Sequence, residues 1–189
     1  MTDKTNIKVE DIKKEAERRH QCLVQGSLYY ITEFLSGPMC GRCFPCSMGS
    51  YEAKIRIANI QQGEGSKGDL AALRQIATQM QKGSMCKRGK DTAQYLSEWL
   101  NTGVFEEHVG HCCGALRCPS MIEYRVIPQK CTSCGLCKEA CRFNAISGQR
   151  RKPYMPNTHP FEILDRKCNR CGECIKVCPE DAIVLVCSE

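Results

Sequence analysis

The sequence lacks the segments that direct a chain into or across a membrane. Its first 20 residues are polar and charged, without the apolar core of a secretory signal peptide. No apolar run approaches the ~20 residues that a membrane span needs. Aromatic residues make up only 6% of the chain. We therefore expect a cytoplasmic protein, in which thiols stay reduced and clustered cysteines bind metals more often than they pair with one another.

The sequence also lacks the patterns of common enzymes and of nucleic-acid-binding proteins. No Ser/His/Asp set, paired-carboxylate site or glycine-rich phosphate loop is organised in it, so we predict no catalytic residues. The formal net charge of +6 suggests an acidic partner, but basic residues do not alternate with aromatic ones. Each [4Fe–4S] cluster with four thiolates adds about −2, so three clusters would bring the net charge to roughly zero. We expect no nucleic-acid partner.

What the chain has in excess is cysteine, with 17 in all, and spacing decides what they bind. Two copies of C-x2-C-x2-C-x3-C lie near the C-terminus, the second followed by Pro179. This is the bacterial two-cluster ferredoxin pattern, in which the fourth cysteine of each copy binds the cluster of the other copy. One [4Fe–4S] cluster is expected on Cys131, Cys134, Cys137 and Cys178, and another on Cys168, Cys171, Cys174 and Cys141.

Zinc is the alternative for these motifs, because C-x2-C pairs also bind zinc. Zinc uses two such pairs per site, however, and does not explain a third and fourth cysteine in each copy. Two features depart from the usual ferredoxin pattern: Arg142 replaces the proline after the fourth cysteine, and the loop between the copies, about 147–166, is long. We expect both to change local shape and potential more than ligation.

A further cysteine set lies in a segment with helical periodicity. Apolar residues recur at helical spacing over about 69–81 and 91–100, which predicts a small helical bundle over 21–105. Three cysteines in C-x2-C-x2-C spacing precede one helix, and a distant fourth ends another. Three close cysteines and a distant one are typical of a [4Fe–4S] site rather than a zinc site. The set is Cys40, Cys43, Cys46 and Cys86.

The segments Ser36–Cys46, Gly68–Leu73 and Gly83–Cys86 resemble a known domain. It is the cluster-binding helical part of the flavin subunit of respiratory complex I, and more closely that of NAD-linked, electron-bifurcating hydrogenases. In that family a two-cluster ferredoxin follows, in this same order, so the resemblance covers about 20–189. It implies a [4Fe–4S] cluster on the four cysteines of the helical domain. The family's flavin- and NADH-binding domain has no counterpart here, so we expect a separate small subunit that binds neither flavin nor NAD.

The remaining cysteines suggest a zinc hinge between the two domains. Two cysteines lie in the spacing Cys113-x4-Cys118, and a histidine precedes them by five residues. With Cys22, at the start of a helix, they form a Cys3His set of the kind that holds structural zinc. The resemblance to the hydrogenase subunits assigns Cys22, His108, Cys113 and Cys118 as the ligands. His111 and Cys112 are rival ligands. The same residues could instead be unligated buried thiols or hold a [2Fe–2S] cluster, and Cys187 is expected to be a strand residue.

Together these patterns predict an α+β chain in which a small helical bundle binds one [4Fe–4S] cluster and a bacterial two-[4Fe–4S] ferredoxin-like domain follows. We expect four segments: a charged helix or arm (1–20), which packs lightly or docks a partner, a helical cluster domain (21–105), a zinc hinge (106–120) and a ferredoxin domain (121–189).

The predicted function is that of a non-catalytic electron-transfer subunit. It would relay electrons between a flavin- or NAD(P)H-linked redox subunit and a catalytic oxidoreductase subunit in a hetero-oligomer, and the family adds electron bifurcation to this expectation. A freely diffusing ferredoxin-like carrier and a zinc-dependent structural or regulatory module are the alternatives. Expected cofactors are three [4Fe–4S] clusters and one Zn²⁺.

Overall fold

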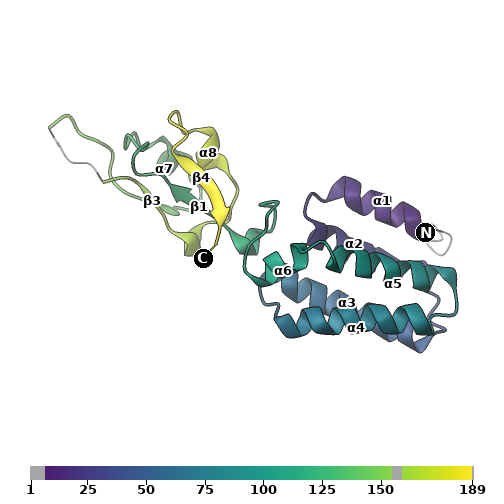
Figure 1. Ribbon diagram of the computed structural model, residues 1–189. Coiled ribbons are helices and arrows are strands. Elements are labelled where there is room, and N and C mark those ends of the chain that lie inside the picture. The colour runs from purple at the N-terminus through teal and green to yellow at the C-terminus, as the bar shows by residue number, and fades with distance from the viewer. Residues whose placement is uncertain (1–6, 155–158, 189) are drawn as a thin grey trace. The chain divides into compact units, whose positions relative to one another are not determined.

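The computed structural model describes residues 7–154 and 159–188, which form two compact units, 7–121 and 122–188 (Figure 1). The first is helical and the second holds short strands and helices, so the predicted α+β class with a helical part before a ferredoxin-like part is confirmed. The first six residues of the predicted arm, and residues 155–158 and 189 of the predicted ferredoxin domain, lie outside the described residues.

Six helices build the first unit. They are α1 (Val9–Arg19), α2 (Leu23–Ser36), α3 (Phe44–Gln62), α4 (Lys67–Gly83), α5 (Lys87–Leu100) and α6 (Val104–Val109), followed by a 3-10 turn at Pro119–Met121. Of the described helices, none has the length and apolar content to cross a membrane.

Local signals fix where these helices begin and end. Ser66 precedes α4 and forms a capping box with Asp69, in which each side chain accepts a hydrogen bond from the other residue's backbone N–H. Gly63 ends α3 with a φ of 83°, a left-handed conformation that glycine adopts without strain. Cys43 and Cys86 are the residues immediately before α3 and α5. Two of the predicted cluster ligands therefore lie at helix N-termini, where the helix dipole favours negative charge.

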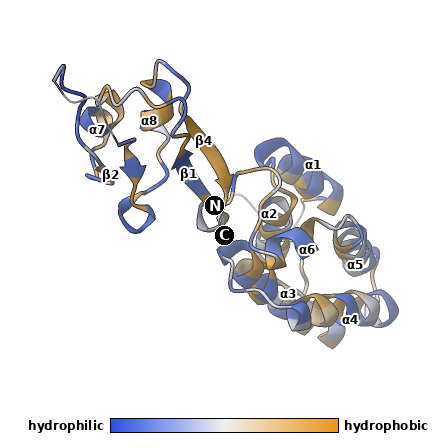
Figure 2. Cartoon of the chain, turned by 60° about the vertical axis from the view of Figure 1, so that its left-hand side comes forward, coloured by the Kyte–Doolittle hydropathy of each residue, from blue (hydrophilic) through white to orange (hydrophobic). Residues whose placement is uncertain are grey.

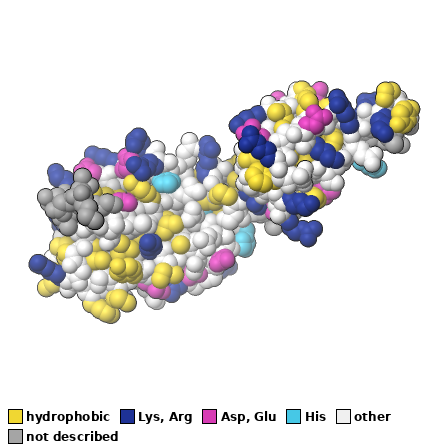
Figure 3. Space-filling view, turned by 180° about the vertical axis from the view of Figure 1, so that it is seen from behind, with side chains coloured by type: hydrophobic (Ala, Val, Ile, Leu, Met, Phe, Trp, Pro, Cys, Tyr) yellow, Lys and Arg dark blue, Asp and Glu magenta, His cyan; other side chains and the backbone are white. Residues whose placement is uncertain are grey.

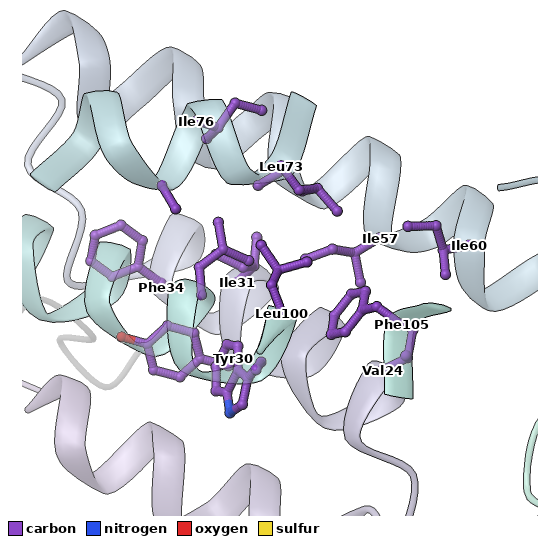
Figure 4. Packing of buried hydrophobic residues seen from close by; sticks show 14 of the residues in the cluster. Val24, Tyr30, Ile31, Phe34, Ile57, Ile60, Leu73, Ile76, Leu100 and Phe105 are labelled. Atoms are coloured by element: carbon purple, nitrogen blue, oxygen red, sulfur yellow. The ribbon is translucent and has the colours of Figure 1, made fainter. Parts of the chain in front are cut away.

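The core of the helical unit is formed by one side of each helix (Figure 4). Apolar residues of α3, α4 and α5 are buried in this core: Ile57, Ile60, Leu73, Ile76, Leu96, Trp99 and Leu100. Hydrophilic and hydrophobic residues alternate along the helices, as the hydropathy colouring shows (Figure 2), and α3 also exposes apolar residues.

Helix α1 belongs to this core. Val9, Ile12 and Ala16 are at most 5% exposed and pack in the same cluster as α2 to α5. Lys13 adds an ion pair with Glu98 of α5 at 3.0 Å. The helix is therefore packed more firmly than a lightly held arm, because three apolar residues spaced along one face are removed from water together.

The second unit contains two small antiparallel sheets. In one, β1 (Ile122–Val126) pairs with β4 (Ile183–Cys187), so that Tyr124 lies opposite Leu185. In the other, β2 (Ile146–Ser147) pairs with β3 (Glu162–Ile163). Two short helices, α7 (Leu136–Ala140) and α8 (Glu173–Lys176), follow the first cysteines of each motif, and a 3-10 turn (Asp165–Lys167) precedes the second motif. Cys187 is a strand residue, as the sequence predicts.

Candidate metal centres

Two small cysteine-lined cavities lie in the second unit. Each is lined by three cysteines of one motif and the fourth cysteine of the other motif. The first cavity contains Cys131, Cys134, Cys137 and Cys178, and the second contains Cys168, Cys171, Cys174 and Cys141. Apolar side chains complete the walls: Val126, Phe161 and Ile183 in the first, and Ile146 and Ile163 in the second.

The two motifs share a backbone pattern. Gly135 and Gly172, next to the second cysteine of each motif, have φ values of 88° and 78°, which let the loop turn tightly around the cavity. At the end of each motif a backbone N–H points at the fourth cysteine. The Ala145 N–H donates to Cys141 Sγ, and the Ala182 N–H to Cys178 Sγ, both at 3.3 Å. Such N–H···S bonds stabilise negative charge on the sulfur.

The thiols in these cavities interact electrostatically. Burial raises the pKa of Cys174 to about 11, and negative charge on Cys168 adds to the effect. Burial also raises the pKa of Cys137, and thiolates at Cys131, Cys134 and Cys178 raise it further. Four thiolates gathered in one site therefore need a positively charged centre to offset their repulsion. The set of four cysteine donors, of which Cys137 and Cys174 are the buried members, fits an iron–sulfur cluster.

In the helical unit, the termini of α3 and α5 bring the third cysteine set together. Burial raises the pKa of Cys46 in the first turn of α3, and negative charge on Cys86, Cys43 and Cys40 raises it further, which places the four thiols near one another. The Met85 N–H donates to Cys43 Sγ at 3.4 Å. Cys43 and Cys46 are buried, whereas Cys40 and Cys86 are exposed. One edge of this site therefore faces solvent.

Ser84 is a residue of this site that sequence reasoning missed. It is 3% exposed, and its hydroxyl has no hydrogen-bond partner among the described residues. The hydroxyl lies beside Cys46, where it opposes the larger effect of burial, which raises the pKa of that thiol. A Cβ at Gly89 would approach Cys46 Sγ to 3.2 Å and Ser84 Oγ to 2.8 Å, so glycine is needed for this packing. The only hint in the sequence is that Ser84 lies two residues before Cys86.

Replacement of Ser84 by Ala should lower the reduction potential of a cluster held here. An O–H donor stabilises the more negative, reduced state, and a hydrogen bond worth about 1 kcal/mol corresponds to roughly 40 mV for one electron. Redox titration followed by EPR measures the shift. Ser47→Ala is the matched control, because the Ser47 hydroxyl donates to the Phe44 carbonyl at 3.4 Å. Equal potentials in both variants would contradict the assigned role.

A fourth group of side chains converges in the core of the helical unit. Its members are Cys22, His108, Cys113 and Cys118, all buried, with ligand atoms within 4.8 Å of one another. Cys22 precedes α2, His108 lies in α6, and the two other cysteines follow α6. His108 Nε2 lies 3.2 Å from Cys22 Sγ and 3.5 Å from Cys118 Sγ. The rival residues His111 and Cys112 are not members of this group.

The hydrogen bonds of His108 orient its ring for ligation. Nδ1 lies 2.8 Å from the Val104 carbonyl oxygen, which can only accept, so Nδ1 carries the proton and Nε2 faces the sulfurs. Burial would lower the pKa of His108, but the hydrogen bonds to Cys22 and Val104 raise it to about 9. The hydrogen bond with Cys118 lowers the pKa of Cys22. A histidine held by a backbone carbonyl, with three cysteines, fits a tetrahedral structural zinc site.

Comparison with known families identifies both units. Residues 26–110 match the NADH-ubiquinone oxidoreductase-F iron–sulfur binding region. Residues 130–182 match the 4Fe-4S dicluster domain. The chain joins these two iron–sulfur domains. The predicted resemblance and the predicted [4Fe–4S] cofactor class are thereby confirmed, whereas neither family description mentions zinc, which stays a prediction.

Curated relatives agree with this identification. The chain is 29% identical over 136 residues to the NADP-reducing hydrogenase subunit HndC of Solidesulfovibrio fructosivorans, covering 70% of this chain and 28% of that protein. It is 37% identical over 101 residues to the NADP(+)-dependent formate dehydrogenase subunit beta of Moorella thermoacetica, covering 48% and 13%.

A third relative is a subunit of the NADH-quinone oxidoreductase of Streptomyces coelicolor, 32% identical over 80 residues, covering 41% of this chain and 18% of that protein. The chain spans less than a third of each relative's length. It is an iron–sulfur electron-transfer protein region, homologous to parts of subunits of NAD(P)-linked oxidoreductases.

Proposed function

We propose that this chain is an electron-transfer subunit of a multisubunit oxidoreductase. It relays electrons between a flavin- or NAD(P)H-linked redox subunit and a catalytic partner. The predicted electron bifurcation stays a prediction. The proposed [4Fe–4S] ligands are Cys40, Cys43, Cys46 and Cys86 for the first site, Cys131, Cys134, Cys137 and Cys178 for the second, and Cys168, Cys171, Cys174 and Cys141 for the third.

The crossed arrangement of the fourth cysteines carries the proposal. Cys178 lines the cavity of the first motif and Cys141 that of the second. This exchange of the fourth cysteine is the ligation pattern of bacterial two-cluster ferredoxins, whereas a zinc site would leave the third or fourth cysteine of each motif without a role. Two sites that each take a ligand from the other motif lie close together. A short distance between clusters is what an electron relay needs.

The clusters, when bound, supply one-electron chemistry, and the chain's own residues set the conditions for it. Val126, Phe161 and Ile183 exclude water from the second site. Backbone N–H groups of Ala145 and Ala182 offset negative charge on the sulfurs. No proton-transfer group is required of the protein.

We also propose that Cys22, His108, Cys113 and Cys118 hold a zinc ion with a structural role. The four residues come from the start of α2, from α6 and from the loop that follows α6. A bound ion would therefore link the first part of the bundle to its last part. The buried location supports a closed structural site rather than a catalytic one, which keeps an open coordination position.

An exposed apolar stripe favours a subunit over a freely diffusing carrier. Phe44, Met48, Tyr51 and Ile55 lie at helical spacing on α3 and are 53–75% exposed, and Met85, next to Cys86, is 86% exposed. Contiguous apolar surface of this kind is typical of a stable protein contact. It begins at the exposed edge of the first cluster site. The relatives are likewise named as subunits.

The proposal is tested on the native complex, purified anaerobically through a tag on this chain. Addition of NADH or NADPH to the complex should produce the EPR signals of reduced [4Fe–4S] clusters, whereas the isolated chain should respond only to dithionite. If dithionite produced these signals in the complex and neither NADH nor NADPH did so, a relay linked to NAD(P)H would be contradicted. A stable complex whose clusters accept no electrons would favour the structural module instead.

A further inference from the structure

A patch of exposed basic side chains lies against the first cysteine loop of the second unit. It consists of Lys138 on α7 and of Arg150, Arg151 and Lys152 in the loop after β2, and we call these four residues the basic patch. The projecting loop of this unit carries dark blue Lys and Arg side chains beside yellow ones in Figure 3. None of these charges belongs to the assigned metal sites.

The loop is fixed on the cluster-binding segment by specific contacts. The Arg151 N–H donates to the Ser133 carbonyl at 2.9 Å, and Lys138 Nζ donates to the Gly148 carbonyl at 2.9 Å. A Cβ at Gly135 would touch the Arg150 side chain at 3.6 Å. Ser133 and Gly135 lie between Cys131 and Cys137, so the basic patch is held directly over the loop that carries three cysteines of the second site.

The charges of the patch point to a ligand that approaches from solvent. Among the residues lining this surface the one acidic side chain is Glu139, which lies 3.7 Å from Arg150, so the surface is positive. The side chain of Arg150 is 69% exposed. A side chain whose role was to offset the negative charge of the sulfurs would instead be buried beside them. A cluster in the second site carries negative charge and repels an acidic partner. The basic patch reverses the sign of the field at this one face.

The other cysteine loop of the unit has a different neighbour at the corresponding glycine. At Gly172, the counterpart of Gly135, the close neighbour is the Tyr124 hydroxyl, 3.1 Å from an added Cβ. The basic patch, in contrast, is flanked by exposed apolar side chains, Leu136 at 41% and Tyr154 at 73%. Apolar contacts with charged surroundings are the usual make-up of a protein docking surface.

We propose that the basic patch docks an acidic redox protein, which exchanges one electron with the cluster of the second site. The inference rests on the proposed relay and adds a second partner face to it. In the exchange the reduced cluster loses one electron and is oxidised, and the acceptor gains that electron and is reduced. Electrostatic steering by the patch raises the association rate, and salt screens it.

The test uses the cluster-loaded full chain, reduced with a stoichiometric amount of dithionite, and oxidised flavodoxin as the acidic probe. Stopped-flow absorbance gives the second-order rate constant for one-electron reduction of the flavodoxin flavin at several ionic strengths. The variant is Arg151→Gln with Lys152→Gln. Its matched control, Arg166→Gln with Lys167→Gln, removes the same charge immediately before Cys168. A basic cytochrome c is the probe of opposite charge.

We expect the wild-type rate with flavodoxin to fall as salt rises. R151Q/K152Q should lower the low-salt rate roughly three- to tenfold and flatten the salt dependence, while R166Q/K167Q should retain the wild-type behaviour. The rate with cytochrome c should not fall in R151Q/K152Q. Iron content, measured for each variant, shows that the sites are loaded.

Equal losses in both variants would overturn the proposal, because total charge would then explain the rate. So would a salt-independent wild-type rate, or a dimer in sedimentation that R151Q/K152Q abolishes, since a second copy would then occupy the patch. These failures are distinct from failure of the proposed relay. A chain that binds no iron, or whose loaded sites dithionite does not reduce, contradicts the relay itself.

Discussion

Replacement of Cys178 by Ser should destroy the cluster held by the first motif, although Cys178 lies in the second. The reason is geometric: Cys178 lines the cavity of Cys131, Cys134 and Cys137. Iron content should fall from about twelve to about eight per chain if the whole cluster is lost. The decrease should be smaller if a three-iron cluster survives. Chemical iron analysis and EPR of the reduced protein measure the change.

Cys141→Ser is the reciprocal control. It should spare the site of Cys178 and affect the site of Cys168, Cys171 and Cys174, whose cavity Cys141 lines. The two sites have different surroundings, with Phe161 beside one and Tyr124 beside the other. Their EPR spectra should therefore differ, and each variant should lose a different component. Loss of the same component in both variants would contradict the crossed ligand assignment.

Replacement of Cys22 by Ser should strongly destabilise the helical unit. Cys22 is 1% exposed and lies within hydrogen-bonding distance of His108 and Cys118. Loss of a structural metal site belongs to the few single changes that cost more than about 3 kcal/mol of unfolding free energy. For a unit of this size that corresponds to a fall in Tm on the order of 10 °C or more. Calorimetry and zinc analysis of the same preparation measure both consequences.

His111→Asn is the control for the zinc site. His111 is a rival ligand by sequence but is not part of the converging group, and its φ of 60° is one that Asn tolerates well. This variant should keep its zinc and its Tm. Zinc loss in His111→Asn together with zinc retention in Cys22→Ser would reverse the assignment. Absence of zinc from the wild-type protein would leave a hydrogen-bonded thiol–imidazole cluster as the correct description.

The main elements of the fold could be predicted because their sequence patterns are long or repeated. Helices α4 and α5 follow from apolar residues at helical spacing. The crossed cysteine sets of the ferredoxin unit follow from the duplicated spacing alone, because the cluster imposes the geometry.

The rest depends on tertiary contacts that leave little trace in the sequence. Helix α6 has six residues, too few for periodicity to be read, yet it presents His108 to Cys22. Ser84 resembles any polar residue near a helix start until packing against Gly89 buries it. The basic patch requires Arg151 to meet Ser133, 18 positions earlier, through a backbone hydrogen bond. No local pattern predicts such a meeting.

The most direct measurement is the iron, sulfide and zinc content of anaerobically purified protein, combined with EPR after reduction with dithionite. Three [4Fe–4S] sites and one zinc site predict about twelve irons, about as much sulfide and about one zinc per chain, with EPR spectra of interacting S = 1/2 clusters. A content of about eight irons would show that one cluster is missing and would contradict the cluster assigned to Cys40, Cys43, Cys46 and Cys86. Zinc in place of iron and sulfide would contradict electron transfer altogether.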